Sequence, residues 1–338
     1  MPSGRSKSVR LGIGFGGLRN HGFAASTDLV RASIKAEEFG FESTWVPENY
    51  YTNDSLVILA TIGALTRRIR LATSIVNPYT HHTTILALTA CTLDELTSGR
   101  VILGLGVSPK ILINGQMGIE TYKPLTVIRE SVEVLRRLTR GERLDNFQGT
   151  FLNVKNVKLE NARLNNTGIP VYVAAIGPKM LQLAGEIGDG VVLTEICSPE
   201  YVDYARTQIR IGAERAGRKI EDIDIVCRIL TSIEPSNLKV HKTVIGSFFF
   251  KMEKADLVLI GHPIDPDSMS LVKEAGLRGD YAAASEHVPD DVVTGCSILG
   301  TPEEAMRRLD EYRRAGVTLP VLCPPQNQVD RVIQVFGQ

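Results

Sequence analysis

The segment from Ile169 to Glu195 contains the residues of this sequence that are best placed to bind a charged ligand. An apolar strand, Val171 to Ala175, runs into Gly177-Pro178, and an amphipathic helix separates it from a second strand, Val191 to Thr194. A parallel crossover of this kind leaves backbone N–H groups of the first helical turn unpaired, at the positive end of the helix dipole. That turn suits a phosphate group, and the glycine lets the backbone come close to it. The alternative is that Gly-Pro only forms a sharp loop.

Two carboxylates, Glu48 and Glu195, are expected at the ends of strands. Each is a candidate acid–base group, although carboxylates in such loops are more often solvated or ion-paired. The adjacent His81 and His82 fit a polar, hydrogen-bonding loop better than a pair of metal ligands. The sequence has no nucleophile elbow, paired-carboxylate motif or metal-binding triad. A phosphate cradle with few acids instead fits an enzyme whose cofactor carries the difficult chemical step.

Candidate strands alternate with helices along the chain, and most are continuous apolar runs, as expected for a parallel sheet covered by helices. This alternation predicts an α/β fold of the (β/α)8 TIM-barrel type, formed by a single domain over residues 1–338. In such a barrel, functional residues lie at the carboxyl ends of the strands. The predicted strands are Val9–Phe15, Ser43–Pro47, Ile69–Ile75, Arg100–Gly106, Val171–Ala175, Val191–Thr194, Ile223–Ile229 and Leu319–Cys323.

Two stretches interrupt the alternation and predict insertions into the barrel. Residues 141–164 contain short runs around Gly149 that are typical of a hairpin before the fifth strand. Residues 237–291 are too long for an ordinary connection. We expect helical runs there at Val244–Met252 and Met269–Ala275, followed by a polar loop. This second insertion is expected near the mouth of the barrel, as a candidate lid.

The charge balance and the cysteines argue against several classes of protein. Lysine plus arginine and aspartate plus glutamate both number 38, so no net charge attracts nucleic acid or an anionic membrane. No apolar run approaches the roughly 18–20 residues of a membrane span, and the start of the chain lacks a signal-peptide core. The five cysteines have no metal-ligand or redox spacing. We therefore expect no metal site and reduced thiols in a cytoplasmic protein.

The stretch Ser74–Thr80 and the segment Val171–Asp189 are two specific motifs, supported by residues 98–106, 117–119, 300–304 and 315–318. Together they resemble the bacterial-luciferase-like barrel superfamily. Within it the sequence is most similar to the branch that uses the deazaflavin coenzyme F420, especially the methylenetetrahydromethanopterin reductases. The resemblance covers nearly the whole chain.

The resemblance implies a homodimeric F420-dependent oxidoreductase that transfers a hydride between C5 of the deazaflavin and a small organic substrate. That substrate would be a pterin, or an alcohol or carbonyl compound. It also implies a cis peptide bond between Ser74 and Ile75 that supports the ring face, and a phosphate loop around Gly177. The expected cofactor-binding residues are Glu48, Asn49, Ser74, Ile75, Asn77, Gly106, Val107, Ala174, Ala175, Ile176, Gly177 and Pro178, and the expected catalytic residues are Glu48 and Glu195.

Three positions depart from the pattern of the reductases. Gly14 stands where they carry a glutamate, Glu48-Asn49 where they tend to show Asp-His, and Pro109 where an acidic residue is common. We therefore expect a homologue with a changed substrate or proton path, in which Glu195 is a candidate replacement acid. Two alternatives stay open. One is an FMN-dependent two-component monooxygenase of the same fold, and the other is a non-catalytic cofactor-binding homologue.

Overall fold

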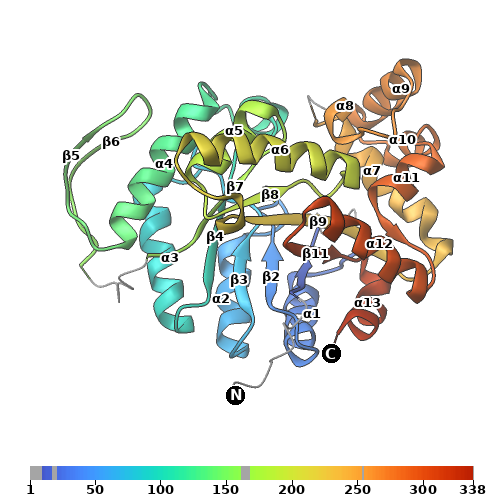
Figure 1. Cartoon of the computed structure of the whole chain (residues 1–338), viewed down its shortest axis with the longest axis horizontal. Helices are drawn as coiled ribbons and strands as arrows, with labels where there is room; N and C mark the ends of the chain where they lie inside the picture. Colours follow the sequence, from blue (N-terminus) through green and yellow to red (C-terminus); the bar gives the residue numbers. More distant parts are fainter. Residues whose placement is uncertain (1–9, 17–20, 161–167, 253–254, 338) are drawn as a thin grey trace.

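Eight parallel strands close into a barrel in the computed structural model, which describes residues 10–16, 21–160, 168–252 and 255–337 (Figure 1). The ring is complete because β8 pairs with β9, β9 with β11, and β11 with β1. The predicted (β/α)8 barrel is therefore confirmed, although Val9 and Gly17 lie outside the described residues. The barrel strands are β1 (Gly12–Gly14), β2 (Ser43–Val46), β3 (Arg70–Thr73), β4 (Val101–Leu105), β7 (Val171–Ala174), β8 (Gly190–Leu193), β9 (Asp224–Ser232) and β11 (Leu319–Cys323).

The strands are apolar on both faces because each face meets a different part of the core. One face of each strand packs on the surrounding helices. The other face fills the barrel interior with a separate cluster made of Trp45, Ala72, Ile102, Tyr172, Val192, Val226, Leu319, Val321 and Cys323. The main departure from the predicted boundaries is β9, which continues three residues past Ile229 to Ser232 and there pairs with β10 (Ile298–Leu299).

Helices cover the outside of the barrel, and local signals fix where several of them begin and end. In α12 the Thr301 hydroxyl accepts from the Glu304 backbone N–H, while the Glu304 carboxylate accepts from the Thr301 N–H at 2.7 Å. Gly316 ends that helix in the left-handed conformation that favours glycine. The covering helices are α1 (Ser26–Glu38), α2 (Ser55–Leu65), α3 (Thr83–Thr97), α4 (Pro124–Thr139), α5 (Pro178–Ile187), α6 (Pro199–Arg215), α12 (Pro302–Ala315) and α13 (Val329–Phe336).

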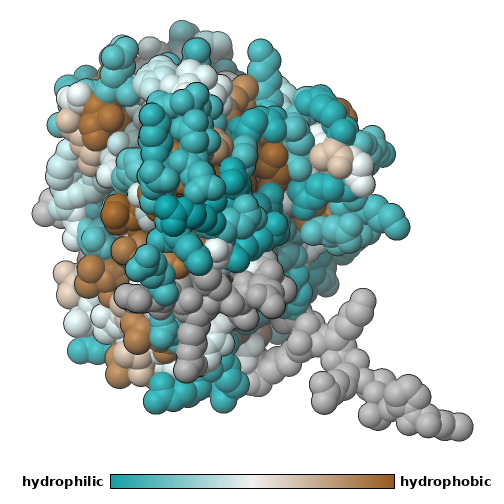
Figure 2. All heavy atoms as spheres, turned by 90° about the vertical axis from the view of Figure 1, so that its left-hand side faces the viewer, coloured by the Kyte–Doolittle hydropathy of each residue, from teal (hydrophilic) through white to brown (hydrophobic). Residues whose placement is uncertain are grey.

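The first interrupted stretch forms an antiparallel hairpin of β5 (Leu144–Gln148) and β6 (Asn153–Val157). It projects beside α4, at the left of Figure 1. Figure 2 views the molecule from this side and shows hydrophilic residues in front, with apolar residues gathered to one side of them.

The second stretch is more helical than predicted. The expected polar loop after Ala275 is wrong, because residues 281–286 and 290–296 are helical. The Asp280 carboxylate caps the first of these helices by accepting from the Ala283 N–H at 3.0 Å. The helices of this region are α7 (Leu238–Phe249), α8 (Ala255–Val258), α9 (Pro266–Leu277), α10 (Tyr281–Glu286) and α11 (Asp290–Cys296).

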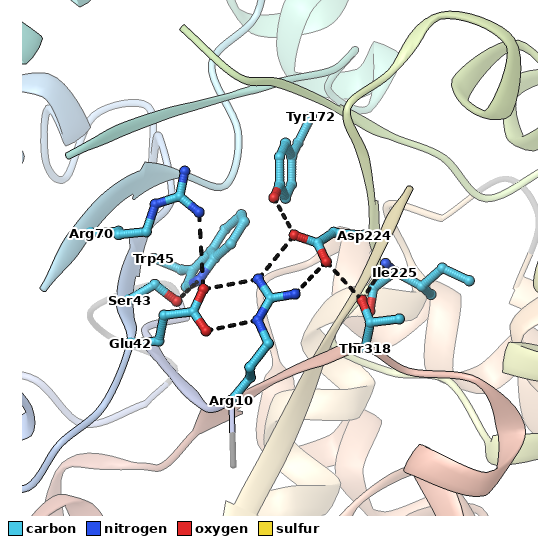
Figure 3. Close-up of polar contacts among 9 residues, drawn as sticks. All are labelled: Arg10, Glu42, Ser43, Trp45, Arg70, Tyr172, Asp224, Ile225 and Thr318. Atoms are coloured by element: carbon cyan, nitrogen blue, oxygen red, sulfur yellow. Dashed lines mark hydrogen bonds and ion pairs between the residues drawn. The ribbon is translucent and has the colours of Figure 1, made fainter. Parts of the chain in front are cut away.

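A network of charged side chains closes the amino end of the barrel (Figure 3). The Arg10 guanidinium lies between two carboxylates, 2.8 Å from Glu42 Oε2 and 2.5 Å from Asp224 Oδ1. The Tyr172 hydroxyl donates to Asp224 Oδ2 at 2.5 Å, and the Thr318 hydroxyl donates to Oδ1. Because active sites of such barrels lie at the opposite end, we interpret this network as structural.

None of the helices in the described part of the chain combines the length and the apolarity that crossing a bilayer requires.

Candidate active site

A cavity of ≈ 430 Å³ opens at the carboxyl ends of the strands, where this fold places its chemistry. Most of its walls come from the carboxyl ends of β7 and β8 and from the segments that follow β3, β4, β7 and β8. Arg228 within β9, Phe248 in the last turn of α7, and Lys251 and Met252 just after that helix complete them. Seven of the predicted cofactor-binding residues line it: Ser74, Ile75, Val107, Ala174, Ala175, Ile176 and Gly177. The sequence therefore located part of the wall of this cavity, from three of its strand ends.

The peptide bond between Ser74 and Ile75 is cis, as the resemblance implied. Neighbouring glycines give this bulge its room. A Cβ on Gly104 would lie 2.0 Å from the Thr73 carbonyl oxygen, and one on Gly106 would lie 3.0 Å from Ile75 Cγ1. Gly106 therefore supports the bulge from behind and is not itself among the residues that line the cavity.

The phosphate-binding turn predicted at Gly177-Pro178 forms the start of α5. Gly177 is the N-cap, and within the described residues no side chain caps this end of the helix. The Ile176 carbonyl accepts from the Tyr201 hydroxyl at 2.8 Å, which holds the turn against α6. Gly177 has an ordinary extended backbone, with φ −83° and ψ 158°. Its glycine is therefore not required by conformation, and the open helix end remains the feature suited to an anion.

Arg228 reaches the cavity from β9 and contacts the carboxyl ends of three other strands, β1, β3 and β8. Its Nη2 donates to the Phe15 carbonyl at 2.7 Å and to Glu195 Oε2 at 2.9 Å. Its Nη1 lies 3.5 Å from the carbonyl oxygen of Ser74, at the cis bond. The other oxygen of the Glu195 carboxylate, Oε1, lies 2.9 Å from His21 Nε2. Gly16 makes room for this imidazole, because a Cβ there would lie 1.9 Å from Nε2.

Glu195 is fully buried behind Arg228 and does not line the cavity. Burial alone would raise the pKa of this carboxyl group, but the neighbouring His21 and Arg228 outweigh it, and the pKa is lowered. An ionised carboxylate that is shielded from the cavity does not suit the proton-donating role that we expected. Its geometry instead suits a counter-ion that fixes Arg228.

Glu48 is also engaged by neighbours and does not line the cavity. Its Oε2 accepts from the Ser55 hydroxyl at 2.6 Å, and its Oε1 lies 3.6 Å from His81 Nε2. Burial would raise the pKa of Glu48, but the hydrogen bonds from His81 and Ser55 prevail and lower it. The adjacent Asn49 donates to the Gly16 carbonyl at 3.4 Å. Direct contact of Glu48 or Asn49 with a ligand in this cavity is therefore not supported by the geometry.

Two further predicted residues, Asn77 and Pro178, do not line the cavity but belong to segments that do. The Asn77 side-chain oxygen accepts from the Tyr79 N–H at 3.0 Å, and Pro178 occupies the first position of α5. Of the two histidines, His82 caps α3 by accepting from the Thr84 N–H, and His81 pairs with Glu48, so the loop is polar as expected. No group of three or more His, Cys, Asp or Glu residues in the described ranges is arranged to hold a metal ion.

Several wall residues had no role assigned from the sequence. Arg228 was placed at a strand end without a function, and Phe248, Lys251 and Met252 were recognised only as part of a helical run. The single available signal was a basic residue inside an otherwise apolar strand, Cys227-Arg228-Ile229, because an arginine is rarely buried without a partner.

The arrangement has matches among known proteins. Residues 13–319 match the family described as luciferase-like monooxygenase. The chain belongs to this family. It is 31% identical over 328 residues to 5,10-methylenetetrahydromethanopterin reductase from Methanopyrus kandleri, covering 92% of this chain and 93% of that protein. It is 32% identical over 309 residues to the reductase of the same name from Archaeoglobus fulgidus, covering 90% and 91%.

A solved luciferase-like structure extends this similarity to the fold. The structure of coenzyme F420-dependent tetrahydromethanopterin reductase from Methanopyrus kandleri superposes with a TM-score of 0.85 at 28% identity, over 97% of this chain and 98% of that one. The two chains therefore share their fold over nearly their whole length.

Proposed function

We propose that this protein is an F420-dependent oxidoreductase, with a methylenetetrahydromethanopterin-type pterin as the first substrate to test. When bound, the deazaflavin would supply hydride transfer at its C5 to or from a substrate carbon. The observation that carries the proposal is the cavity itself, which has the cis bulge at Ser74-Ile75 on its floor and the uncapped start of α5 at its edge. The similarity to F420-dependent reductases at about 30% identity supports the same cofactor.

The residues present fit such a cofactor. Ile75, Val107 and Ala175 give the cavity apolar surfaces suited to a flat ring. The buried Ser74 hydroxyl and Arg228 Nε have no hydrogen-bond partner within the described part of the chain, so a ligand with acceptor atoms would complete them. The N-terminus of α5 would hold a phosphate of the cofactor tail.

The chain's own contribution is binding, orientation and exclusion of water. Ile75 and Val107 would fix the plane of the ring, which places the reacting carbon within range of the substrate. Phe248, from the last turn of α7, and Met252, three residues past its end, line the cavity and would keep water from the reaction. Together these contacts would hold the ring and the substrate in the orientation that hydride transfer requires.

Proton handling falls to groups other than carboxylates, since no aspartate or glutamate lines the described cavity. The Tyr79 hydroxyl donates a hydrogen bond to the Tyr122 carbonyl, and burial raises the pKa of this hydroxyl. Burial lowers the pKa of Lys251, which makes this ammonium group a stronger acid than that of an exposed lysine. Lys251 is therefore our candidate for a proton donor in place of Glu195.

A titration decides between the cofactors. The protein is mixed with F420 and, separately, with FMN, and the absorption spectrum and affinity are recorded. Tight binding of F420, followed by bleaching or recovery of its absorbance with methylenetetrahydromethanopterin or acetone in stopped flow, is the expected result. Tight FMN binding without F420 binding would instead favour the monooxygenase, which the description of the family supports. Binding without turnover on any substrate would favour the non-catalytic alternative.

We also propose that the protein is a homodimer that associates through α2 and α3. Helix α2, SLVILATIGAL, carries no charged side chain, although a helix on the surface of a barrel normally has a polar outer face. Val57, Leu65 and Leu96 are 64%, 58% and 74% exposed. An apolar face shared by two neighbouring helices suits burial against a second copy of the same face.

A further inference from the structure

The floor of the cavity contains two buried hydrogen-bond donors that no described residue satisfies. Arg228 Nε and the Ser74 hydroxyl are inaccessible to solvent and have no partner within the described ranges. Both residues line the cavity and are more than nine-tenths buried, with 8% and 6% of their surface exposed. Unsatisfied buried donors are costly, so native structures keep few of them without a reason.

The two donors belong to one assembly. The Arg228 guanidinium contacts the backbone carbonyl of Ser74 through Nη1 at 3.5 Å, so the two residues that carry the donors are in contact. Its Nη2 donates to Phe15 and Glu195, and the Arg228 side chain also hydrogen-bonds Cys323. Nε is the guanidinium nitrogen that has no partner among the described residues. Glu195 supplies the matching negative charge at 2.9 Å and is itself fully buried, so the guanidinium is fixed in charge and direction.

We propose that Arg228 and Ser74 form a two-donor site for a carbonyl or anionic oxygen at the floor of the cavity, with Glu195 as the positioning residue of Arg228. This inference rests on the proposed function. The ligand chemistry is that of an electron-rich oxygen on a planar molecule. Two sources offer it, namely the carbonyl-bearing pyrimidine edge of the cofactor ring and the carbonyl or oxyanion of the substrate.

The site explains the placement of Glu195 better than a structural ion pair alone. In an arginine with a purely structural role, all three guanidinium nitrogens would donate to protein acceptors. Arg10, at the other end of the barrel, donates in this way to Glu42 and Asp224. Arg228 instead presents one unsatisfied N–H beside a ligand cavity. A positive charge next to a redox ring also changes the electronic properties of that ring.

The test compares two changes with a matched control. Ser74→Ala removes one neutral donor and keeps the fold. Arg228→Met with Glu195→Gln removes both members of the buried ion pair, because removing only one would leave an unpaired buried charge. The control, Arg137→Met with Glu142→Gln, removes an ion pair of 3.0 Å whose side chains are 37% and 47% exposed. Thermal unfolding establishes that each variant is folded.

The affinity for F420 alone is measured by titration, with the absorption band of the bound ring as a second readout. We expect Ser74→Ala to weaken binding about threefold to tenfold and the double variant about tenfold or more, as for neutral and charge-assisted hydrogen bonds. The absorption band of the bound ring should move toward that of the free cofactor in the double variant and stay unchanged in the control. A purely structural role of Glu195 would not move that band.

The possible results distinguish a cofactor oxygen from a substrate oxygen as the ligand of the two donors. They also distinguish failure of the two-donor site from failure of the proposed function. Unchanged cofactor affinity and spectrum with a raised KM would assign the donors to the substrate oxygen, which still supports the site. Wild-type affinity, spectrum and KM in both variants would overturn the inference and leave the proposed function intact. If the wild-type protein binds FMN instead, the same comparison applies to FMN, which also has a carbonyl-bearing pyrimidine edge. If it binds neither ring, the proposed function is what fails.

Discussion

The imidazole of His81 lies 3.6 Å from the carboxylate of Glu48, so an ion pair joins the loops that follow β2 and β3. The pair lies beside the cavity and not on its wall. It holds the segment that leads from the cis bulge at Ser74-Ile75 into α3. The geometry of Glu48, which first suggested acid–base catalysis, instead suits a positioning role.

The Glu48–His81 pair predicts a defined pH dependence of stability. Pairing with Glu48 raises the pKa of His81 above its usual 6.5, so this contribution is complete below 6.5 and is lost as the pH rises through the raised pKa. The lowered pKa of Glu48 makes its contribution complete above 4.5 and lost as the pH falls through the lowered value. We expect His81→Gln to cost roughly 0.5–1 kcal/mol between these limits and little at alkaline pH. Urea unfolding of both proteins across pH measures this; a pH-independent difference would contradict it.

Gly177 allows the phosphate loop to be tested by charge alone. Asn and Asp are both good N-cap residues of nearly equal size, and Gly177 has a backbone that either residue can adopt. Gly177→Asp should weaken cofactor binding about tenfold more than Gly177→Asn, because only the aspartate brings a negative charge to the phosphate. Isothermal titration of both variants measures the ratio. Equal affinities would remove this turn from the binding site.

Gly14 has no room for a side chain. A Cβ at this position would lie 2.6 Å from Val321 Cγ1 and 2.7 Å from Cys323 Sγ. Gly14→Ala should therefore destabilise the protein by about 1–3 kcal/mol through overpacking. Adding Val321→Ala should recover part of that loss, so that the double variant costs less than the sum of the two. Gly115→Ala is the control, since a Cβ there would meet nothing within 4 Å. Additive effects in the double variant would contradict this account.

The network at the amino end of the barrel should affect stability without affecting the cavity. Burial would raise the pKa of Asp224, but hydrogen bonds from Arg10 and Tyr172 lower it. Asp224→Asn should lower the free energy of unfolding by about 1.5–3 kcal/mol, as for charge-assisted hydrogen bonds, and leave cofactor affinity unchanged. Denaturant unfolding and cofactor titration test the two statements. Loss of affinity in a folded variant would show that the barrel transmits changes between its ends.

The proposed homodimer is tested by adding a charge to its apolar face. Leu96→Glu places a carboxylate on the most exposed apolar position of α3, and should convert the protein to a monomer in light-scattering measurements. Leu277→Glu is the control, because Leu277 is similarly exposed, at 62%, on α9 outside that face. Dissociation by both variants, or by neither, would remove α2 and α3 from the interface.

The fold was predictable because its signals are local. Continuous apolar strands between amphipathic helices specify a covered parallel sheet, and the capping box at Thr301 and Glu304 fixes where α12 begins. The turn between β7 and α5 was predictable for the same reason, since strand, Gly-Pro and helix follow one another directly in the chain.

The electrostatics of the site depend on contacts between distant residues, and sequence alone did not reveal them. Glu195 meets Arg228 only because β8 and β9 pair in a register that brings their carboxyl ends together. Glu48 is engaged by Ser55 and His81 from two different loops. Likewise, Lys251 reaches the cavity through an insertion whose path along the barrel cannot be predicted from helical periodicity.

One wall of the cavity is built by an element that the barrel does not need for closure. Phe248 lies in the last turn of α7, and Lys251 and Met252 follow just after it, whereas the bulge and the α5 turn belong to the ring of strands and helices. Substitutions in α7 can thus alter which molecule is accepted while the floor stays the same. A line of descent could exchange substrates by drift in this one segment, and a laboratory library confined to it would explore new reactions without rebuilding the scaffold.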